Sequence, residues 1–252
     1  MEHSKSDIQK QLRYLLPKDR LDPLVWSRDD QLLPDVKDSL LRIADEFMEF
    51  LEIDVPIVGV TFTGSLANYN YTSFSDIDLH ILIDFDQVDE NQDLVKDYMM
   101  AKKSMWNDRH DIMIRGHEVE IYPQNTHEAH HSTGVYDITR DEWINKPDKV
   151  EADVDLQAVK KKVRSLMAKI EKSLESDDRL EDLDALKVKI KKMRQSGLER
   201  SGEFSVENLA FKVLRRNGYI ENIYKTSRRD YDKSLSLQQE SLIRNYIKFL
   251  IF

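Results

Sequence analysis

Two apolar runs separated by a polar segment constrain the fold of this chain more than any other feature of its sequence. Residues 57–63 (IVGVTFT) and 77–83 (IDLHILI) are rich in β-branched and large apolar side chains, which predicts two buried β-strands. The pair Gly64-Ser65 follows the first run, and Asp76 directly precedes the second. A sheet built from these strands therefore has a glycine turn and carboxylates at the ends of its buried strands.

Asp76 and Asp78 are two residues apart, so both side chains project from one face of a strand while Ile77 and Leu79 pack toward the other. Two like charges this close repel each other, and burying them is costly unless a cation joins them. Paired carboxylates suit Mg²⁺. The pair therefore predicts a magnesium site, with an exposed edge strand of alternating polar residues as the alternative.

A third carboxylate follows on a predicted hairpin over residues 111–122. Glu118 and Glu120 alternate with apolar residues, so both share one face of the second hairpin strand. Glu120 is the preferred third ligand, and Glu118 remains the alternative. Three carboxylates around one point require metal, and with two Mg²⁺ ions they form a site suited to in-line displacement of pyrophosphate.

The Gly64-Ser65 pair predicts a phosphate-binding turn beside these carboxylates. Glycine allows close approach of the backbone, and a serine that begins a short helix, expected over residues 65–71, offers amide and hydroxyl donors to phosphate oxygens. A helix N-cap without a ligand is the alternative for Ser65.

The order of these elements resembles the signature of the DNA polymerase β-like nucleotidyltransferase superfamily over residues 40–125. The matching segments are Gly64-Ser65, the triplet Asp76-Ile77-Asp78 and the later triplet Val119-Glu120-Ile121.

The resemblance implies a role for each matching polar residue. Asp76, Asp78 and Glu120 would bind two Mg²⁺ ions, for which Mn²⁺ can substitute. Glu120 would also help to deprotonate an acceptor hydroxyl. Gly64 and Ser65 would hold the β- and γ-phosphates of an incoming NTP such as ATP.

Members of this superfamily often carry a helical C-terminal lobe that closes over the nucleotide. A helix predicted over residues 205–217 has Ser205 as its N-cap. It carries Asn208, Lys212 and Arg216 at intervals of four residues, so the three share a face and are candidate triphosphate ligands. A solvated helix face is the alternative.

We expect an α+β fold with an N-terminal arm (1–34), a mixed-sheet nucleotidyltransferase domain with flanking helices (35–150) and an all-helical domain (151–252). The other predicted elements are helices over 35–53, 89–106, 159–174, 183–193 and 237–252, a hairpin of 111–115 and 117–122 with its turn at Arg115-Gly116, and a strand over 134–138.

Composition narrows the setting. Residues 1–150 contain 16 Lys and Arg against 30 Asp and Glu, a net charge of −14, whereas residues 151–252 contain 22 against 17, a net charge of +5. The absence of cysteine excludes disulfides and thiolate zinc sites. No signal peptide or membrane span is apparent, so we expect a cytoplasmic protein without a membrane partner.

Three further features are interpreted structurally. The histidines of residues 127–131 (HEAHH) are read as incidental residues of a loop, and residues 187–194 (KVKIKKMR) as the solvated side of a helix. Tyr136 could stack on a base, but a core position is the preferred interpretation.

These features predict a metal-dependent nucleotidyltransferase that moves NMP from an NTP to an acceptor hydroxyl and releases pyrophosphate. The basic C-terminal half favours an RNA end, such as that of a tRNA, as the acceptor. The alternatives are a small-molecule, protein or nucleotide acceptor, as in antibiotic-modifying, AMPylating or signalling enzymes, and a non-catalytic nucleotide-binding regulator of antitoxin type. The sequence leaves the preferred NTP and the oligomeric state open.

Overall fold

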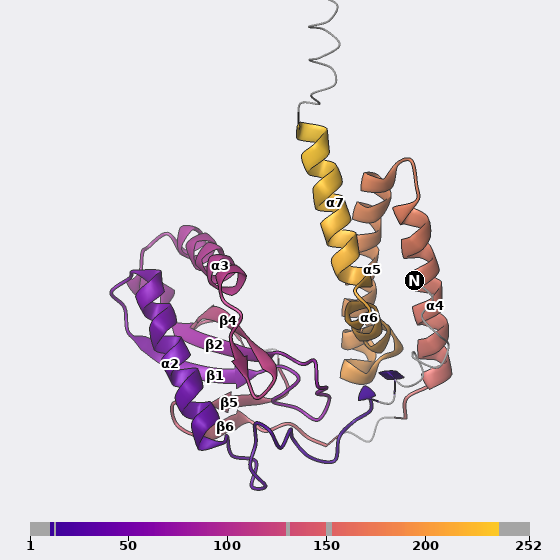
Figure 1. Cartoon of the computed structure of the whole chain (residues 1–252). Coiled ribbons are helices and arrows are strands. Elements are labelled where there is room, and N and C mark those ends of the chain that lie inside the picture. Colours follow the sequence, from indigo (N-terminus) through magenta and orange to yellow (C-terminus); the bar gives the residue numbers. More distant parts are fainter. Residues whose placement is uncertain (1–10, 13, 130–131, 150–152, 237–252) are drawn as a thin grey trace, which may run out of the picture. The chain divides into compact units, whose positions relative to one another are not determined.

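A computed structural model describes residues 11–12, 14–129, 132–149 and 153–236. The chain divides into two compact units (Figure 1), one within Tyr14–Ala152 and the other within Met1–Arg13 and Asp153–Phe252. The first unit contains a mixed sheet with helices, and the described residues of the second form helices and their connections. The predicted α+β class is confirmed.

The sheet of the α/β unit has six strands in the order β3-β4-β2-β1-β5-β6. β2 and β4 are parallel, and every other neighbouring pair is antiparallel. The strands are β1 (Ile57–Thr63), β2 (Ile77–Ile83), β3 (Met113–Ile114), β4 (His117–Asn125), β5 (Val135–Asp137) and β6 (Glu142–Asn145). β1 and β2 have the bounds that the sequence predicts, and the hairpin turn at Arg115-Gly116 is confirmed by positive φ angles at both residues.

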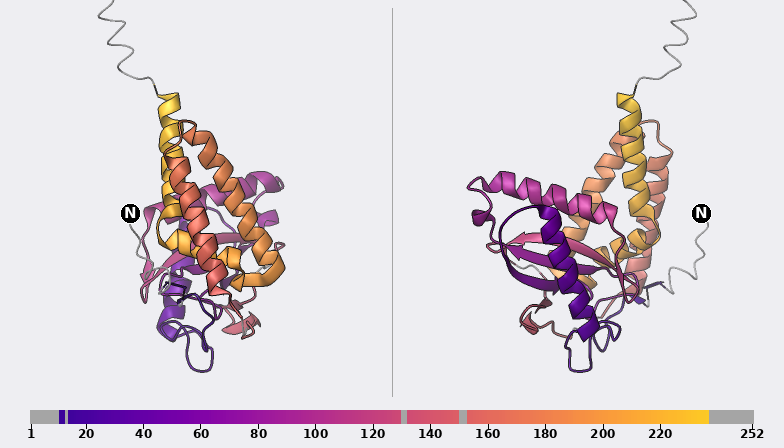
Figure 2. Two further views of the ribbon diagram at one scale, coloured as in Figure 1. Left: turned by 90° about the vertical axis from the view of Figure 1, so that its right-hand side faces the viewer. Right: turned by 60° about the vertical axis from the view of Figure 1, so that its left-hand side comes forward.

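Helices α2 (Pro34–Leu51) and α3 (Gln92–Arg109) cover the apolar face of this sheet (Figure 2). Along β2, the side chains of Ile77, Leu79, Ile81 and Ile83 are fully buried in the core, and the residues between them are half-buried. This alternation leaves the polar residues of β2 on the face opposite its buried side chains. A 3₁₀ helix, η1 (Phe85–Gln87), follows β2.

The segment before α2 contributes to the core of the α/β unit. Trp26 is 2% exposed and donates a hydrogen bond from Nε1 to the Leu66 carbonyl, at 2.7 Å. Its ring packs against Phe62 and Tyr136. The core interpretation of Tyr136 is confirmed, because this side chain is fully buried and its hydroxyl lies 2.6 Å from Asp141 Oδ1.

The segment after Gly64 is a series of turns, so the prediction of a helix over residues 65–71 is wrong. Asn68 explains the difference. Its backbone amide donates to the Ser65 carbonyl, which closes one turn, but its side-chain oxygen accepts from the next amide, that of Tyr69, at 2.7 Å. Such local side-chain bonds compete with helical ones.

The second unit consists of α4 (Leu156–Leu174), α5 (Arg179–Ser201), the 3₁₀ helix η2 (Gly202–Phe204), α6 (Val206–Arg216) and α7 (Tyr219–Leu235). α4 and α6 confirm the predicted helices, and the Ser205 hydroxyl caps α6 by accepting from the Asn208 amide. The helix predicted over 237–252 lies outside the described residues. In the described part of the chain, no helix combines the length and the apolar character that crossing a bilayer requires.

Candidate active site

Gly64, which directly follows β1, lies against the carboxylate of Asp78 on β2. Thr63 pairs with Asp78 in the antiparallel register of these strands. A Cβ atom added to Gly64 would lie 1.7 Å from Asp78 Oδ2, far inside van der Waals contact, and the φ angle of Gly64 is +79°. Both observations require glycine here, because only glycine lacks a Cβ and adopts this φ freely.

Glu120 is the register partner of Asp78 on the parallel strand β4. Since neighbouring residues in register point to the same face of a sheet, the two side chains project together from the face opposite the buried side chains of β2. The sequence left Glu118 and Glu120 as alternatives for a third ligand. The register places Glu120 beside Asp78, and its assignment as a ligand stays a prediction.

Ser65 is tied to the segment that leads into β2. Its hydroxyl lies 2.7 Å from the hydroxyl of Ser75, which in turn accepts from the Thr72 amide at 3.0 Å. Ser75 directly precedes Asp76. The turn after β1 and the start of the Asp76–Asp78 pair therefore form one connected structure.

Lys103 of α3 provides a cation that the sequence analysis missed. Its Nζ lies 3.3 Å from Glu120 Oε1 and 4.7 Å from the centre of the Tyr122 ring. Lys103 compensates part of the charge of Glu120, and the expectation that the three carboxylates bind metal stays a prediction. Only the packing of α3 beside β4 reveals this pair.

Asp76, Asp78 and Glu120 offer the hard carboxylate oxygens that Mg²⁺ prefers. Among the described residues, however, it is Asp84, Asp86 and His127, and not these three, whose donor atoms all lie within 4.8 Å of one another. Glu120, however, is paired with Lys103, and its side chain is 47% exposed. Holding an ion with Glu120 would therefore compete with this ion pair.

Asp84, Asp86 and His127 form another group of possible metal ligands. Within the described residues, these are the three whose donor atoms all lie within 4.8 Å of one another. The group lies beyond the end of β2 that is remote from Asp76. The sequence analysis read His127 as an incidental loop residue and did not place it beside Asp84 and Asp86. His130 and His131 lie outside the described residues.

His117 links the N-terminal segment to the start of the candidate site. This side chain is 3% exposed, with Nε2 3.4 Å from Asp22 Oδ2 and Nδ1 2.7 Å from the Ser75 carbonyl. The Asp22 carboxylate beside the imidazole raises the pKa of His117. Burial alone would raise the pKa of Asp22, but the neighbouring His117 and the hydrogen bond from the Leu24 amide outweigh burial and lower it. Strand alternation, which places His117 on the core side with Val119, was the available signal.

This pair predicts a pH dependence of stability. A raised folded pKa means that His117 stabilises the fold fully below its unfolded pKa of about 6.5, and that this contribution is lost as the pH rises through the folded pKa. Asp22 has the opposite sign, so its contribution is lost as the pH falls below its unfolded pKa of about 3.9. Thermal unfolding at pH 6 and pH 9 should show a smaller difference in Tm for His117→Asn than for the wild type.

His110→Asn is the matched control, and it should keep the wild-type difference in Tm. An unchanged pH dependence in His117→Asn would contradict the assignment of the ion pair.

The candidate metal and phosphate ligands lie in two different units. Gly64, Ser65, Asp76, Asp78 and Glu120 belong to the α/β unit, and Asn208, Lys212 and Arg216 belong to the helical unit.

Asn208 is fully buried, accepts from Arg194 Nε at 3.1 Å and donates to the Glu203 carbonyl at 2.7 Å. Lys212 Nζ lies 3.9 Å from Glu203 Oε2. Burial, and secondarily Arg194 and Arg215, lower the pKa of Lys212 against the opposing effect of Glu203. Asn208 thus serves the internal structure of its unit, and the triphosphate roles remain predictions.

Comparison with known proteins gives little support from similarity. No protein-family model matches this chain, and no curated protein matches it. One similar solved structure is the STING-associated CdnE c-di-GMP synthase from Capnocytophaga granulosa, at 12% sequence identity and a TM-score of 0.24, over 90% of this chain and 89% of that one. A TM-score this low carries no argument about fold or function.

Proposed function

We propose that this protein is a metal-dependent nucleotidyltransferase that transfers NMP from an NTP to an acceptor hydroxyl and releases pyrophosphate. The observation that carries the proposal is the contact between Gly64 and the Asp78 carboxylate, with Glu120 in register on the adjacent strand. A phosphate-binding turn and metal-binding carboxylates must lie this close to act on one triphosphate.

Each residue has a part in this proposal. Asp76, Asp78 and Glu120 would hold the metal, and Mg²⁺, when bound, stabilises the charge that develops during phosphoryl transfer. The Gly64 backbone and the Ser65 hydroxyl would bind phosphate oxygens. Glu120 would accept the proton of the acceptor hydroxyl, and Lys103 would orient Glu120 between turnovers.

An RNA end is the acceptor that we propose. This choice of acceptor rests on charge, since residues 151–252 carry a net charge of +5 in a chain whose total is −9. Excess Lys and Arg attract phosphate backbones. Small-molecule, protein and nucleotide acceptors are the alternatives that the experiment must separate.

The proposal is tested by incubating the protein with Mg²⁺ and each α-³²P-labelled NTP, together with total RNA, total protein or a metabolite extract. We expect label in the RNA fraction and complete loss of transfer in EDTA, because without a divalent cation the carboxylates repel the triphosphate. Label in the protein or metabolite fraction instead would show that RNA is not the acceptor. The absence of both labelled product and released pyrophosphate in every mixture would contradict nucleotidyl transfer.

A further inference from the structure

A pocket of about 510 Å³ lies between α5, α6 and α7, entirely within the helical unit. Its size falls within the range of small-molecule sites, roughly 300–1,000 Å³. Among the described residues that line it, three are cations and none is a carboxylate. A concave surface of this composition selects for an anionic ligand.

The floor of the pocket is apolar and aromatic. Ile190 and Ile223 are 4% and 1% exposed and close its base. Phe211 and Tyr224 add two rings, and Tyr224 is 57% exposed, so its ring remains accessible to a ligand. An exposed ring beside an apolar floor suits a planar aromatic group, which gains by stacking.

The cations line the pocket from α5. Lys187, Lys191 and Arg194 are spaced by four and three residues, which places them on one face of the helix. Lys187 has a counter-ion, Asp184, at 2.7 Å, whereas the ion pairs among the described residues include neither Lys191 nor Arg194.

Arg194 is also held in place. Its guanidinium lies 4.4 Å from the centre of the Phe211 ring, and its Nε donates to Asn208. A preorganised guanidinium loses little freedom when it binds phosphate.

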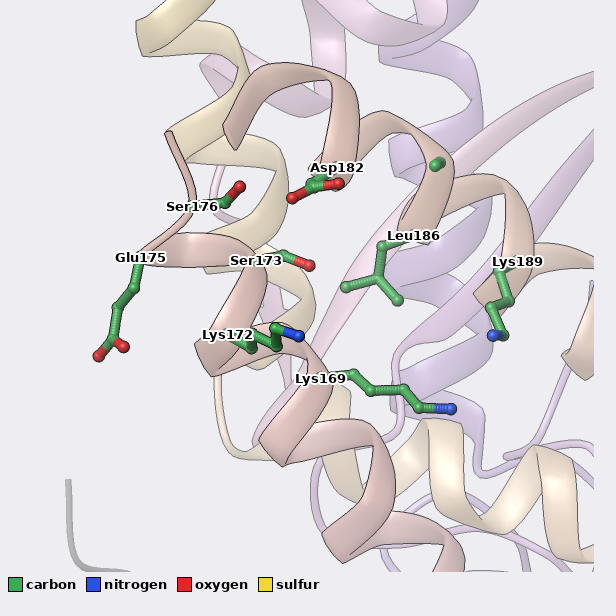
Figure 3. Close-up of a pocket in the computed structure, with 9 residues that line it drawn as sticks. Lys169, Lys172, Ser173, Glu175, Ser176, Asp182, Leu186 and Lys189 are labelled. Carbon is green, nitrogen blue, oxygen red and sulfur yellow. The ribbon is translucent and has the colours of Figure 1, made fainter. Parts of the chain in front are cut away.

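The groove between α4 and α5 offers a contrast within the same unit (Figure 3). Lys169, Lys172 and Lys189 line it together with the carboxylates of Glu175 and Asp182, so its charges are mixed. It has no aromatic residue in its described lining. An aromatic anion therefore fits the pocket between α5, α6 and α7 and not this groove.

We propose that the pocket between α5, α6 and α7 binds a nucleoside phosphate, with the base on Tyr224 and the phosphate at Lys191 and Arg194. A free nucleotide and a nucleotide of single-stranded RNA share this chemistry. Lys191 is exposed, in agreement with the interpretation of residues 187–194 as a solvated helix face, and the proposal adds a binding role to it. Binding here requires no catalysis and is independent of the proposed transfer reaction.

The test measures binding by the full chain in EDTA, with AMP in equilibrium dialysis and with a fluorescein-labelled ten-nucleotide oligoadenylate in fluorescence anisotropy. Lys191→Glu and Tyr224→Ala should each weaken binding by about tenfold, because each removes a phosphate contact or a stacking ring. Lys189→Glu is the matched control, since it makes the same charge change on the same helix but lines the other groove. It should retain wild-type affinity.

Binding of AMP that depends on Lys191 and Tyr224 supports a free nucleotide as the ligand, and the same dependence for the oligoadenylate alone supports RNA. Failure of both probes to bind, or equal losses in Lys189→Glu and Lys191→Glu, overturns the proposal. Circular dichroism of each variant confirms that the helices are retained. Because the assay contains no divalent metal, its failure leaves the transfer reaction to its own test.

Discussion

Asp78→Asn is expected to lower the rate of nucleotidyl transfer by about 10³-fold or more while the protein stays folded. The substitution preserves the shape of the side chain beside Gly64 and removes the negative charge that the proposed metal requires. Release of pyrophosphate from the NTP, with and without the acceptor, measures the loss.

Asp84→Asn is the matched control for this experiment. It makes the same change at the other end of β2, within the Asp84, Asp86 and His127 group. We expect transfer to continue in this variant. Greater loss in Asp84→Asn than in Asp78→Asn would move the metal to that end of the strand. Survival of a cellular effect in Asp78→Asn would favour a non-catalytic, regulatory role.

Gly64→Ala is expected to reduce transfer by at least about 10²-fold and also to lower stability. A Cβ at this position would lie 1.7 Å from Asp78 Oδ2, so either the carboxylate or the turn must move. A positive φ of +79° adds strain of about 1–2 kcal/mol for a residue other than glycine. Activity and the free energy of unfolding in urea are the two quantities to measure.

Gly116→Ala separates these two causes. Gly116 has a similar φ, +88°, but a Cβ there would meet nothing within 4 Å. The control should lose about 1–2 kcal/mol of stability from backbone strain and keep its transfer activity. Equal activities in Gly64→Ala and Gly116→Ala would contradict a functional contact between the turn and Asp78.

The strands of the site could be predicted from the sequence because their residues favour β-structure and also occupy buried positions in the sheet. Residues 57–63 and 77–83 are apolar and β-branched, and both are central strands of the sheet. The turn after Gly64 was harder to predict, since Asn68 diverts a plausible helix start by bonding to the backbone. The 17 residues of α7 were missed because their charged and polar side chains obscure a narrow apolar stripe.

The remaining features of the site depend on contacts between distant segments. The partnership of Asp78 and Glu120 arises from the parallel pairing of β2 with β4, which no spacing rule specifies. Lys103 enters only through the packing of α3, and the partnership of His117 with Asp22 only through the packing of the N-terminal segment. Sequence patterns identify the chemical types at this site, and tertiary register decides which of them meet.

Crystals of the protein with Mn²⁺ and a non-hydrolysable NTP test the central claim most directly. The account predicts anomalous peaks for Mn²⁺ at about 2.0–2.3 Å from carboxylate oxygens of Asp76 and Asp78. It also predicts that triphosphate oxygens contact the Gly64-Ser65 turn. Mn²⁺ bound only at Asp84, Asp86 and His127, or a nucleotide that leaves the Gly64-Ser65 turn free, would contradict it.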